Sequence, residues 1–235
     1  MRISAIVPAL NEGVGIAATL RALAPVRENG GEIVVVDGGS DDDTVALAKP
    51  LSDRVIHAPR GRARQMNAGA AAACGDVLWF VHADTIAAAH VVDTLRAALA
   101  SSSREWGRFD VRLAGTHPAL RLVAWSMNLR SRLSGIATGD QGIFVSRDAF
   151  DAVGGFPEIP LMEDIALSRA LRRRGRPLCL RAALTTSGRR WQDHGIARTV
   201  LLMWRLRFAY WRGADPAVLA RRYRGGASGT TDEHG

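Results

Sequence analysis

The sequence has few cysteines and no long apolar runs, and these absences exclude several classes of protein. Of its 235 residues only Cys74 and Cys179 are cysteines, and they lie far apart in no metal-ligand spacing. This argues against a disulfide scaffold or a zinc site and is typical of a protein in a reducing cytosol. No uninterrupted apolar stretch approaches the roughly 18–20 residues that cross a bilayer, and the apolar run within residues 1–10 is too short for a signal peptide. We therefore expect a soluble, cytoplasmic protein that is at most bound at the inner face of the membrane.

Lysine is almost absent as well, because Lys49 is the single lysine among 31 basic residues. The net charge of +8 is unevenly spread: residues 169–224 contain fifteen arginines and two acids, Asp193 and Asp215. Such a surface favours an anionic partner, namely phosphates, nucleic acid or an acidic membrane face. The hydrophobic content of 47% is ample for a packed core.

The first hundred residues alternate between two kinds of segment. Short apolar runs typical of buried strands lie at residues 3–8, 32–36, 54–58 and 77–81. Segments with helical spacing follow them at residues 16–29, 44–49, 62–74 and 90–100, with Ser40 and Asp43 in a capping-box pattern before the second. This alternation predicts an α/β fold with a doubly wound, mostly parallel sheet and helices on both faces.

The second half of the chain is less regular. It predicts strands at residues 109–113, 142–146 and 178–181, and helices at residues 120–133, 163–174 and 199–211. In the helix at 120–133, Leu122, Trp125 and Leu129 share one face.

Polar residues follow the strand at 77–81, whose sequence continues as His82-Ala83-Asp84. Open α/β sheets bind ligands at the carboxyl ends of their strands. There His82 and Asp84 can share a divalent cation, since carboxylate and substrate phosphate suit Mg²⁺ and the histidine makes Mn²⁺ plausible. In the alternative interpretation Asp84 caps the helix at 90–100. The stretch alone does not decide between the two.

Two further loops follow strands. Asn11 and Glu12 come after the first strand and line the ligand crevice, or Asn11 caps the next helix. Residues 36–44 (VDGGSDDDT) form a glycine-rich turn before a helix, but three consecutive aspartates would repel a phosphate. We expect instead that Asp37 accepts hydrogen bonds from a base or ribose.

Three other segments carry chemistry-bearing side chains. Arg60, Arg62 and Arg64 cluster at a strand-to-helix junction, where arginine can hold a diphosphate, although a solvated charge run is the alternative. Adjacent acids such as Glu163 and Asp164 often only stabilise a helix start, and Asp140 lies earlier in a Gly-Asp-Gln-Gly segment. Residues 187–194 (SGRRWQDH) either grip a phosphate or ring or form a surface turn.

In their order, these segments resemble a family 2 glycosyltransferase of the GT-A fold over residues 1–211, and look most like a branch of small bacterial members labelled as radical-SAM- and selenodomain-associated. The resemblance implies a Rossmann-like single domain, with a nucleotide-binding half at 1–100 and an acceptor and catalytic half at 101–211. Residues 212–235 form an extension that we expect to be disordered from about residue 225.

The resemblance also implies site residues. Nucleotide-binding positions match Pro8, Asn11, Glu12, Asp37, Arg64 and Asn67. His82 and Asp84 match the Asp-x-Asp motif with histidine in the first place, which leaves Asp84 as the metal contact and His82 at the ribose position. Glu163 and Asp164 match the Glu-Asp pair whose aspartate is the catalytic base. Arg190 and Trp191 match an Arg-Trp pair that binds the donor, without the glutamine that precedes it elsewhere, and His194 is a possible third metal ligand.

The expected function is therefore inverting transfer of a sugar from a nucleotide-diphosphate donor to a hydroxyl acceptor, assisted by Mg²⁺ or Mn²⁺. Two alternatives are a nucleotidyltransferase on a similar fold and a non-catalytic binder of nucleic acid or membrane. The binder has no use for six acids at predicted strand ends and loops, namely Glu12, Asp37, Asp84, Asp140, Glu163 and Asp164, so we expect no nucleic-acid partner.

The last predicted helix, extended to residues 199–212, mixes large apolar side chains with arginine. This composition is typical of a helix at a membrane surface, where it would present a lipid-linked acceptor. The alternative, slightly favoured, is that the helix packs on the domain while its arginines extend to solvent.

Overall fold

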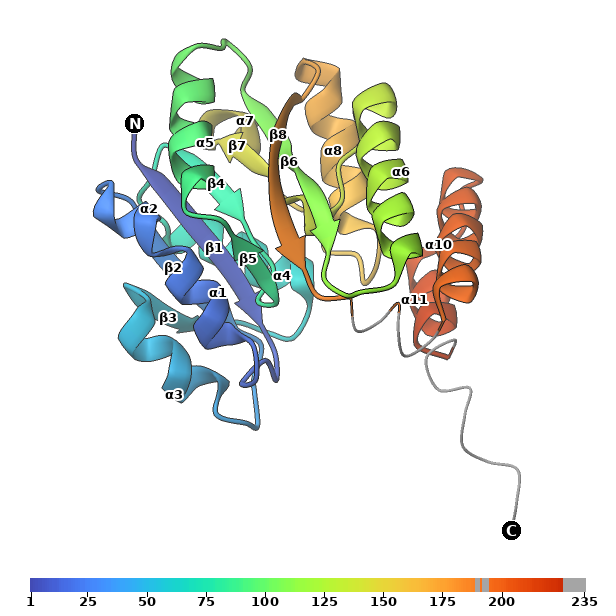
Figure 1. Cartoon of the computed structure of the whole chain (residues 1–235), viewed down its shortest axis with the longest axis horizontal. Coiled ribbons are helices and arrows are strands. Elements are labelled where there is room, and N and C mark those ends of the chain that lie inside the picture. Colours follow the sequence, from blue (N-terminus) through green and yellow to red (C-terminus); the bar gives the residue numbers. More distant parts are fainter. Residues whose placement is uncertain (189–190, 192–194, 226–235) are drawn as a thin grey trace.

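A single sheet runs through both halves of the chain in the computed structural model, which describes residues 1–188, 191 and 195–225 (Figure 1). In this part of the chain the sheet has eight strands in the order β3-β2-β1-β4-β7-β6-β8-β5. The strands are β1 (Ile3–Ala9), β2 (Glu32–Asp37), β3 (Arg54–His57), β4 (Val77–Phe80), β5 (Thr85–Ala87), β6 (Trp106–Leu113), β7 (Phe144–Ser146) and β8 (Leu178–Thr186). Four of the seven neighbouring pairs are parallel, which confirms the predicted fold class.

The helices that connect these strands cover both faces of the sheet. They are α1 (Ile16–Ala22), α2 (Ala24–Glu28), α3 (Thr44–Ala48), α4 (Arg62–Ala72), α5 (His90–Ala100), α6 (Pro118–Ser134), α7 (Arg147–Ala152), α8 (Glu163–Arg174), α10 (Ile196–Trp211) and α11 (Pro216–Gly225), with single turns η1 (Lys49–Leu51) and η2 (Gly139–Gln141). None of the described helices combines the length and hydropathy that a membrane span requires.

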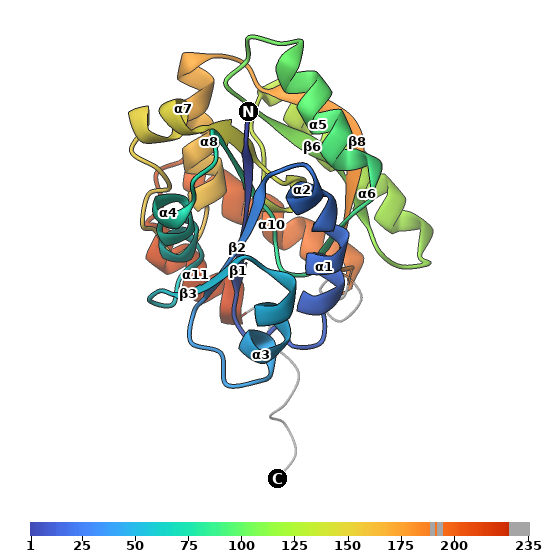
Figure 2. The same cartoon turned by 90° about the vertical axis from the view of Figure 1, so that its left-hand side faces the viewer.

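Alternating side chains of the central strands build two separate cores. In β1, Ala5 and Val7 face the core covered by α1, α2, α3 and α5, whereas Ile6 faces the core beneath α4, α7 and α8. Figure 2 shows α4 on one side of β1 and β2, and α1 with α5 on the other. Because both faces are covered, β2 and β4 are buried at every residue, and between the polar ends of β2 and throughout β4 the sequence is a continuous apolar run.

Several predicted elements have the expected bounds and others differ. The helix α8 begins and ends at the predicted residues, whereas β8 continues past 181 to Thr186. The helix predicted at 16–29 is divided into α1 and α2, because Pro25 lies at the start of α2, where its missing N–H favours a new helix. The elements β5, α7 and α11 were not predicted. The disorder expected from about residue 225 concerns residues that lie almost entirely outside the described part of the chain.

Three interpretations based on helix capping are wrong. Asp84 precedes β5, and α5 begins later, after Ala89. Asn11 does not cap α1, whose N-cap is Gly15. Ser40 does not cap α3, whose N-cap is Asp43; the Ser40 hydroxyl donates to Asp37 at 2.5 Å and accepts from the Asn11 amide at 3.0 Å.

The predicted apolar face of α6 exists, but it points away from the core. Leu122 and Trp125 are 64% and 60% exposed, and Leu129 is exposed as well. The opposite face, with Val123 and Met127, packs on β6 and on the start of α10.

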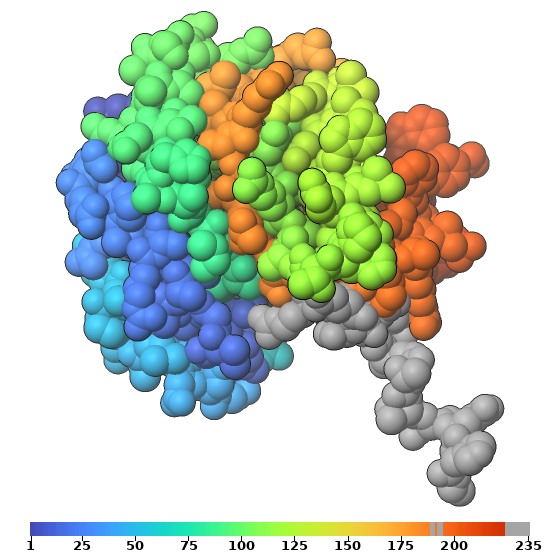
Figure 3. Space-filling model, in the orientation of Figure 1, coloured from blue at the N-terminus to red at the C-terminus, as the bar shows by residue number. Residues whose placement is uncertain are grey.

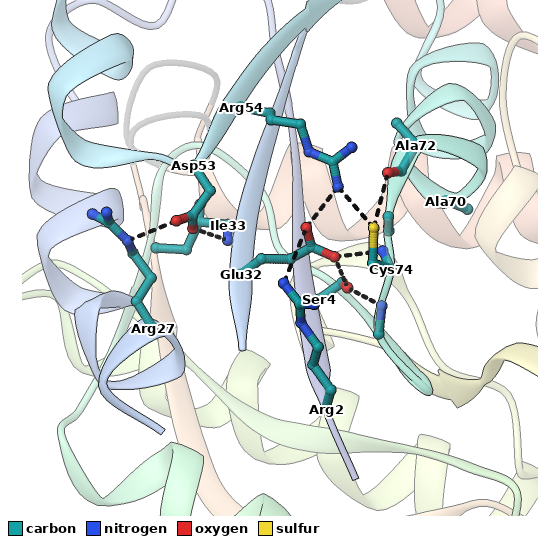
Figure 4. Close-up of polar contacts among 12 residues, drawn as sticks. Arg2, Ser4, Arg27, Glu32, Ile33, Asp53, Arg54, Ala70, Ala72 and Cys74 are labelled. Carbon is teal, nitrogen blue, oxygen red and sulfur yellow. Dashed lines mark hydrogen bonds and ion pairs between the residues drawn. The ribbon is translucent and has the colours of Figure 1, made fainter. Parts of the chain in front are cut away.

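A buried polar network holds the amino ends of the parallel strands together (Figure 4). The Glu32 carboxylate on β2 accepts hydrogen bonds from the Ser4 hydroxyl at 2.6 Å, the Arg54 guanidinium at 2.6 Å and the Cys74 amide at 2.5 Å. Burial opposes ionisation of Glu32, but these hydrogen bonds and the Arg54 charge outweigh it and lower its pKa. The network therefore joins β1, β2, β3 and the end of α4 at the amino ends of the strands, away from their carboxyl ends.

Removing the Glu32 charge should destabilise the protein. We expect Glu32→Gln to lower the free energy of unfolding by about 2 kcal/mol at neutral pH, because charged hydrogen bonds become neutral ones. Since the folded-state pKa of Glu32 lies below the unfolded value, this contribution is present above pH 4.5 and is lost as pH falls through the folded pKa. Urea unfolding between pH 7 and pH 3 measures it. The exposed Glu28→Gln on α2 is the matched control, and equal stability of the two variants at pH 7 would contradict the assignment.

Candidate active site

A cleft of about 630 Å³ opens at the carboxyl ends of β1 and β4 and at the amino end of α8. It is lined by residues from both halves of the chain. Among the sequence-predicted residues it includes Pro8, Glu12, His82, Asp84, Glu163, Asp164 and Trp191. Asp84 and Asp164, which are 80 residues apart in the sequence, thus line one cleft, as the prediction required.

The start of α8 holds Asp164 in a fixed orientation. The helix begins after Met162, a non-glycine residue in the left-handed conformation with φ 71°. One carboxylate oxygen of Asp164 accepts a hydrogen bond from the Gly139 amide at 2.9 Å, and the other accepts one from the Ile165 amide at 2.7 Å. Two backbone donors therefore orient this half-buried carboxylate at the wall of the cleft.

Its neighbour Glu163 is buried and held by an arginine from the first half of the chain. Arg62 Nη1 lies 3.3 Å from the Glu163 carboxylate, which is 3% exposed as a residue. Burial and the negative charge of Asp164 raise the pKa of Glu163, while Arg62 acts in the opposite direction. The two acids thus have different surroundings, with Glu163 paired inside the protein and Asp164 hydrogen-bonded only by backbone amides among the described residues.

The turn η2 connects the two halves at the cleft. His82 Nδ1 lies 3.2 Å from the Asp140 carboxylate. The other ring nitrogen, Nε2, is buried with no hydrogen-bond partner among the described residues, and a Cβ added to Gly139 would lie 2.4 Å from it. Burial opposes ionisation of Asp140, but the hydrogen bond from His82 and the charges of Arg62 and Arg207 leave its pKa below the ordinary value.

This geometry bears on the suggestion that His82 and Asp84 share a cation. His82 Nδ1 faces Asp140 and the ring packs on Gly139, so a cation shared by His82 and Asp84 stays a prediction. The Asp84 carboxylate has a long contact of 3.4 Å with the Thr186 hydroxyl. In the described part of the chain no three His, Cys, Asp or Glu side chains are grouped as a metal site. A Mg²⁺ or Mn²⁺ ion held by one carboxylate, substrate phosphates and water needs no such group, so Asp84 fits a metal only together with a bound diphosphate.

Asp37 and Asn11 are predicted nucleotide contacts that do not line the cleft. The Asp37 carboxylate is buried and accepts hydrogen bonds from Gly39 and Ser40. The Nδ1 atom of His57 lies 3.1 Å from the same carboxylate. Burial opposes its ionisation, but the hydrogen bonds from Ser40 and its neighbours lower its pKa. The Asn11 side chain accepts a hydrogen bond from the Asp41 amide at 2.9 Å. Both side chains therefore shape the loops after β1 and β2, and their contact with a nucleotide stays a prediction.

Arg64 and Asn67, on α4, also lie away from the cleft lining. Arg64 is exposed and pairs with Glu158 at 3.1 Å. The Asn67 side chain donates to the Phe156 carbonyl at 2.8 Å and accepts from the Phe156 amide at 2.9 Å. These contacts join α4 to the segment before α8.

Arg190 and His194, predicted for the donor and the metal, lie outside the described residues. Sequence reasoning did not single out two residues that line the cleft, Arg62 and Arg207. Arg62 was grouped with Arg60 and Arg64 without a distinction among the three. Arg207 lies in an amphipathic helix whose composition is typical of a surface element, so its sequence position did not distinguish it from the other arginines of that helix.

The sheet order and the position of the cleft place the chain among the GT-A-type α/β folds. The model of glycosyl transferase family 2 matches residues 4–149, more than half of the chain. The chain belongs to this family.

Relatives and solved structures agree with this assignment. The chain is 31% identical over 164 residues to uncharacterized glycosyltransferases from two strains of Mycobacterium tuberculosis, and the match covers 66% of this chain and 62% of theirs. The structure of residues 1–349 of TarS from S. aureus, in complex with UDP-GlcNAc, superposes on this chain with a TM-score of 0.66 at 20% identity. The superposition covers 80% of this chain and 58% of that one. Glucosyl-3-phosphoglycerate synthase from Mycobacterium tuberculosis, in complex with Mn²⁺, UDP and phosphoglyceric acid, has a TM-score of 0.58 at 21% identity, over 79% and 69%.

Proposed function

We propose that the protein transfers a sugar from a nucleoside-diphosphate donor to a hydroxyl acceptor, with inversion at the anomeric carbon. The observation that carries this proposal is that Asp84 and Asp164 line one cleft at the carboxyl edge of the sheet. Family membership supports the reaction class, and the complexes of the structural neighbours with UDP-GlcNAc or with UDP and Mn²⁺ support a nucleotide-sugar donor.

The donor occupies the part of the cleft built by the first half of the chain, next to Pro8, Glu12 and Asp84. A divalent cation, Mg²⁺ or Mn²⁺, would be held by Asp84 and the donor diphosphate, and would neutralise the charge that grows on the departing diphosphate. Arg60 and Arg62 line the cleft and can add to this stabilisation, whereas Arg64 is turned toward Glu158.

Asp164 acts as the general base. Its carboxylate is oriented by the Gly139 and Ile165 amides, which leaves oxygen lone pairs for an acceptor hydroxyl in the cleft. It takes the hydroxyl proton while the acceptor oxygen attacks the anomeric carbon and the nucleoside diphosphate leaves on the opposite side. A base in this role must lie within hydrogen-bond reach of the proton it removes.

Asp164→Asn should lower turnover at least about a hundredfold without weakening donor binding, because the amide keeps the shape but accepts no proton. Release of nucleoside diphosphate from a panel of UDP-sugars measures turnover, and calorimetric titration with UDP and Mn²⁺ measures binding. Asp148→Asn, an exposed aspartate in the first turn of α7, is the matched control. Near-normal turnover would remove Asp164 from this role, and release of pyrophosphate would identify a nucleotidyltransferase instead.

Asp84→Ala should abolish the metal-dependent part of nucleotide binding. In a thermal-shift panel of UDP, GDP, CMP and dTDP, we expect the preferred nucleotide to raise the wild-type melting temperature by about 5 °C with Mn²⁺, and much less without it. The shift should disappear in Asp84→Ala and persist in Asp93→Ala, which removes an exposed aspartate on α5. Equal shifts in wild type and Asp84→Ala would exclude a metal at Asp84.

We also propose that α10 contacts an anionic membrane surface and brings the site to a lipid-linked acceptor. One face of the helix packs on the domain, where Leu206 is buried. The alternative interpretation, in which the helix only packs on the domain, therefore accounts for one of its two faces. On the other face Trp204 and Trp211 are 72% and 71% exposed. Arg212 lies over the Phe208 ring at 6.0 Å, and residues 196–212 contain no acid. Exposed aromatics beside arginines are the composition that suits anionic phospholipid.

The helix lies at the edge of the molecule beside α6 (Figures 1 and 3), and α11 packs on it while Trp204 and Trp211 stay exposed. In liposome flotation we expect binding to vesicles that contain phosphatidylglycerol and little binding to neutral ones. The double variant Trp204→Ala, Trp211→Ala should weaken it at least about tenfold, because each tryptophan buries apolar area in the interface. Trp125→Ala, an exposed tryptophan on α6, is the control. No flotation of the wild type with anionic vesicles would exclude this contact.

A further inference from the structure

Two arginines near Asp164 have guanidinium groups that the described residues do not satisfy. Arg207 on α10 lines the cleft, and its Nε is buried without a hydrogen-bond partner. Arg130 on α6 donates through Nη1 to the Ile136 carbonyl at 3.2 Å, while its Nε and its other Nη are buried without partners. The great majority of buried donors in proteins have a hydrogen-bond partner, so these unsatisfied donors, of which that of Arg207 lies at the cleft, indicate a missing acceptor.

Both guanidinium groups are subject to burial and to the charges of their neighbours. Burial, followed by the positive charge of Arg207, lowers the pKa of Arg130 to about 10. Burial also lowers the pKa of Arg207, and the negative charges of Asp164 and Asp140 act against this effect. Arg207 thus lines the cleft and its positive charge acts on Arg130 on α6. An anion bound to Arg207 in the cleft would relieve this repulsion and satisfy the unmet Arg207 donor.

The neighbouring carboxylates are already engaged elsewhere. Asp164 accepts from two backbone amides, Glu163 is held by Arg62, and Asp140 faces His82. None of these acids forms a hydrogen bond or ion pair with Arg207 or Arg130 in the part of the chain that the structure describes. An external anion is thus the group that fits the pair.

We propose that Arg207, with Arg130 behind it, binds a phosphate or carboxylate group of the acceptor, next to the hydroxyl that Asp164 deprotonates. This inference rests on the proposed function, because it assigns the anion to the acceptor by its position beside the proposed base. The acceptor would accordingly be an anionic hydroxyl compound, since guanidinium groups bind phosphate and carboxylate oxygens with paired hydrogen bonds. The diphosphate of the donor is the other possible source of the same chemistry.

Calorimetric titration with inorganic phosphate, in the presence of saturating UDP and Mn²⁺, tests the assignment because the donor position is then filled. We expect wild type to bind phosphate, and Arg207→Gln to bind it at least about tenfold more weakly with UDP affinity changed less than about twofold. Arg207→Lys should recover part of the phosphate affinity, and Arg130→Gln should weaken it as well. Arg205→Gln, an exposed arginine on the same helix, should match wild type.

Three results would overturn the inference. Phosphate affinity unchanged in a folded Arg207→Gln would exclude the pair as its site. Loss of UDP affinity in that variant, or loss of wild-type phosphate binding once UDP is bound, would assign the arginines to the donor diphosphate. If UDP with Mn²⁺ does not bind wild type at all, the proposed function fails, while phosphate titration of the free protein still reports on the arginine pair separately.

Discussion

The geometry of the cleft depends on the three residues of η2, which hold the two halves of the chain against each other. The Gly139 amide donates to Asp164 at the start of α8, and Asp140 faces His82 at the end of β4. Glycine is required at position 139 because a Cβ would lie 2.4 Å from the His82 ring. One turn therefore sets the orientation of the carboxylate that we propose as the base and fixes the strand end that carries Asp84.

The sheet supplies the rigidity behind this turn. The strand β7 inserts antiparallel beside β4, with Trp79 opposite Phe144, so the second half of the chain continues the sheet of the first. At the far edge the Glu32 network joins the amino ends of the parallel strands. The residues that stabilise the sheet are thus separate from those of the cleft. The Glu32 hydrogen bonds lie at the amino ends of the strands, and incompletely satisfied polar groups that a ligand can use lie at the carboxyl ends.

Much of the fold and part of the site could be predicted from local patterns. Apolar runs identified the four parallel strands of the first half, because strands covered on both faces of a sheet are mostly apolar. The rule that ligands bind at carboxyl strand ends selected Glu12 and Asp84, which line the cleft, and Asn11, which does not. Elements with few local signals were missed, such as the strand β5, which is held by pairing with β8 and whose three residues are too few to show an alternating pattern.

The residue pattern determined the fold class, the strand ends and the family, since these follow from periodicity and from motifs read along the chain. Which side chains meet was decided by folding in three dimensions. His82 faces Asp140, Arg64 turns to Glu158, and Arg207 lines the same cleft as Asp164 with its Nε unsatisfied. The physical reason is that the packing of elements distant in the sequence decides which partner a charged side chain meets. The spacing of residues within one segment does not contain that information.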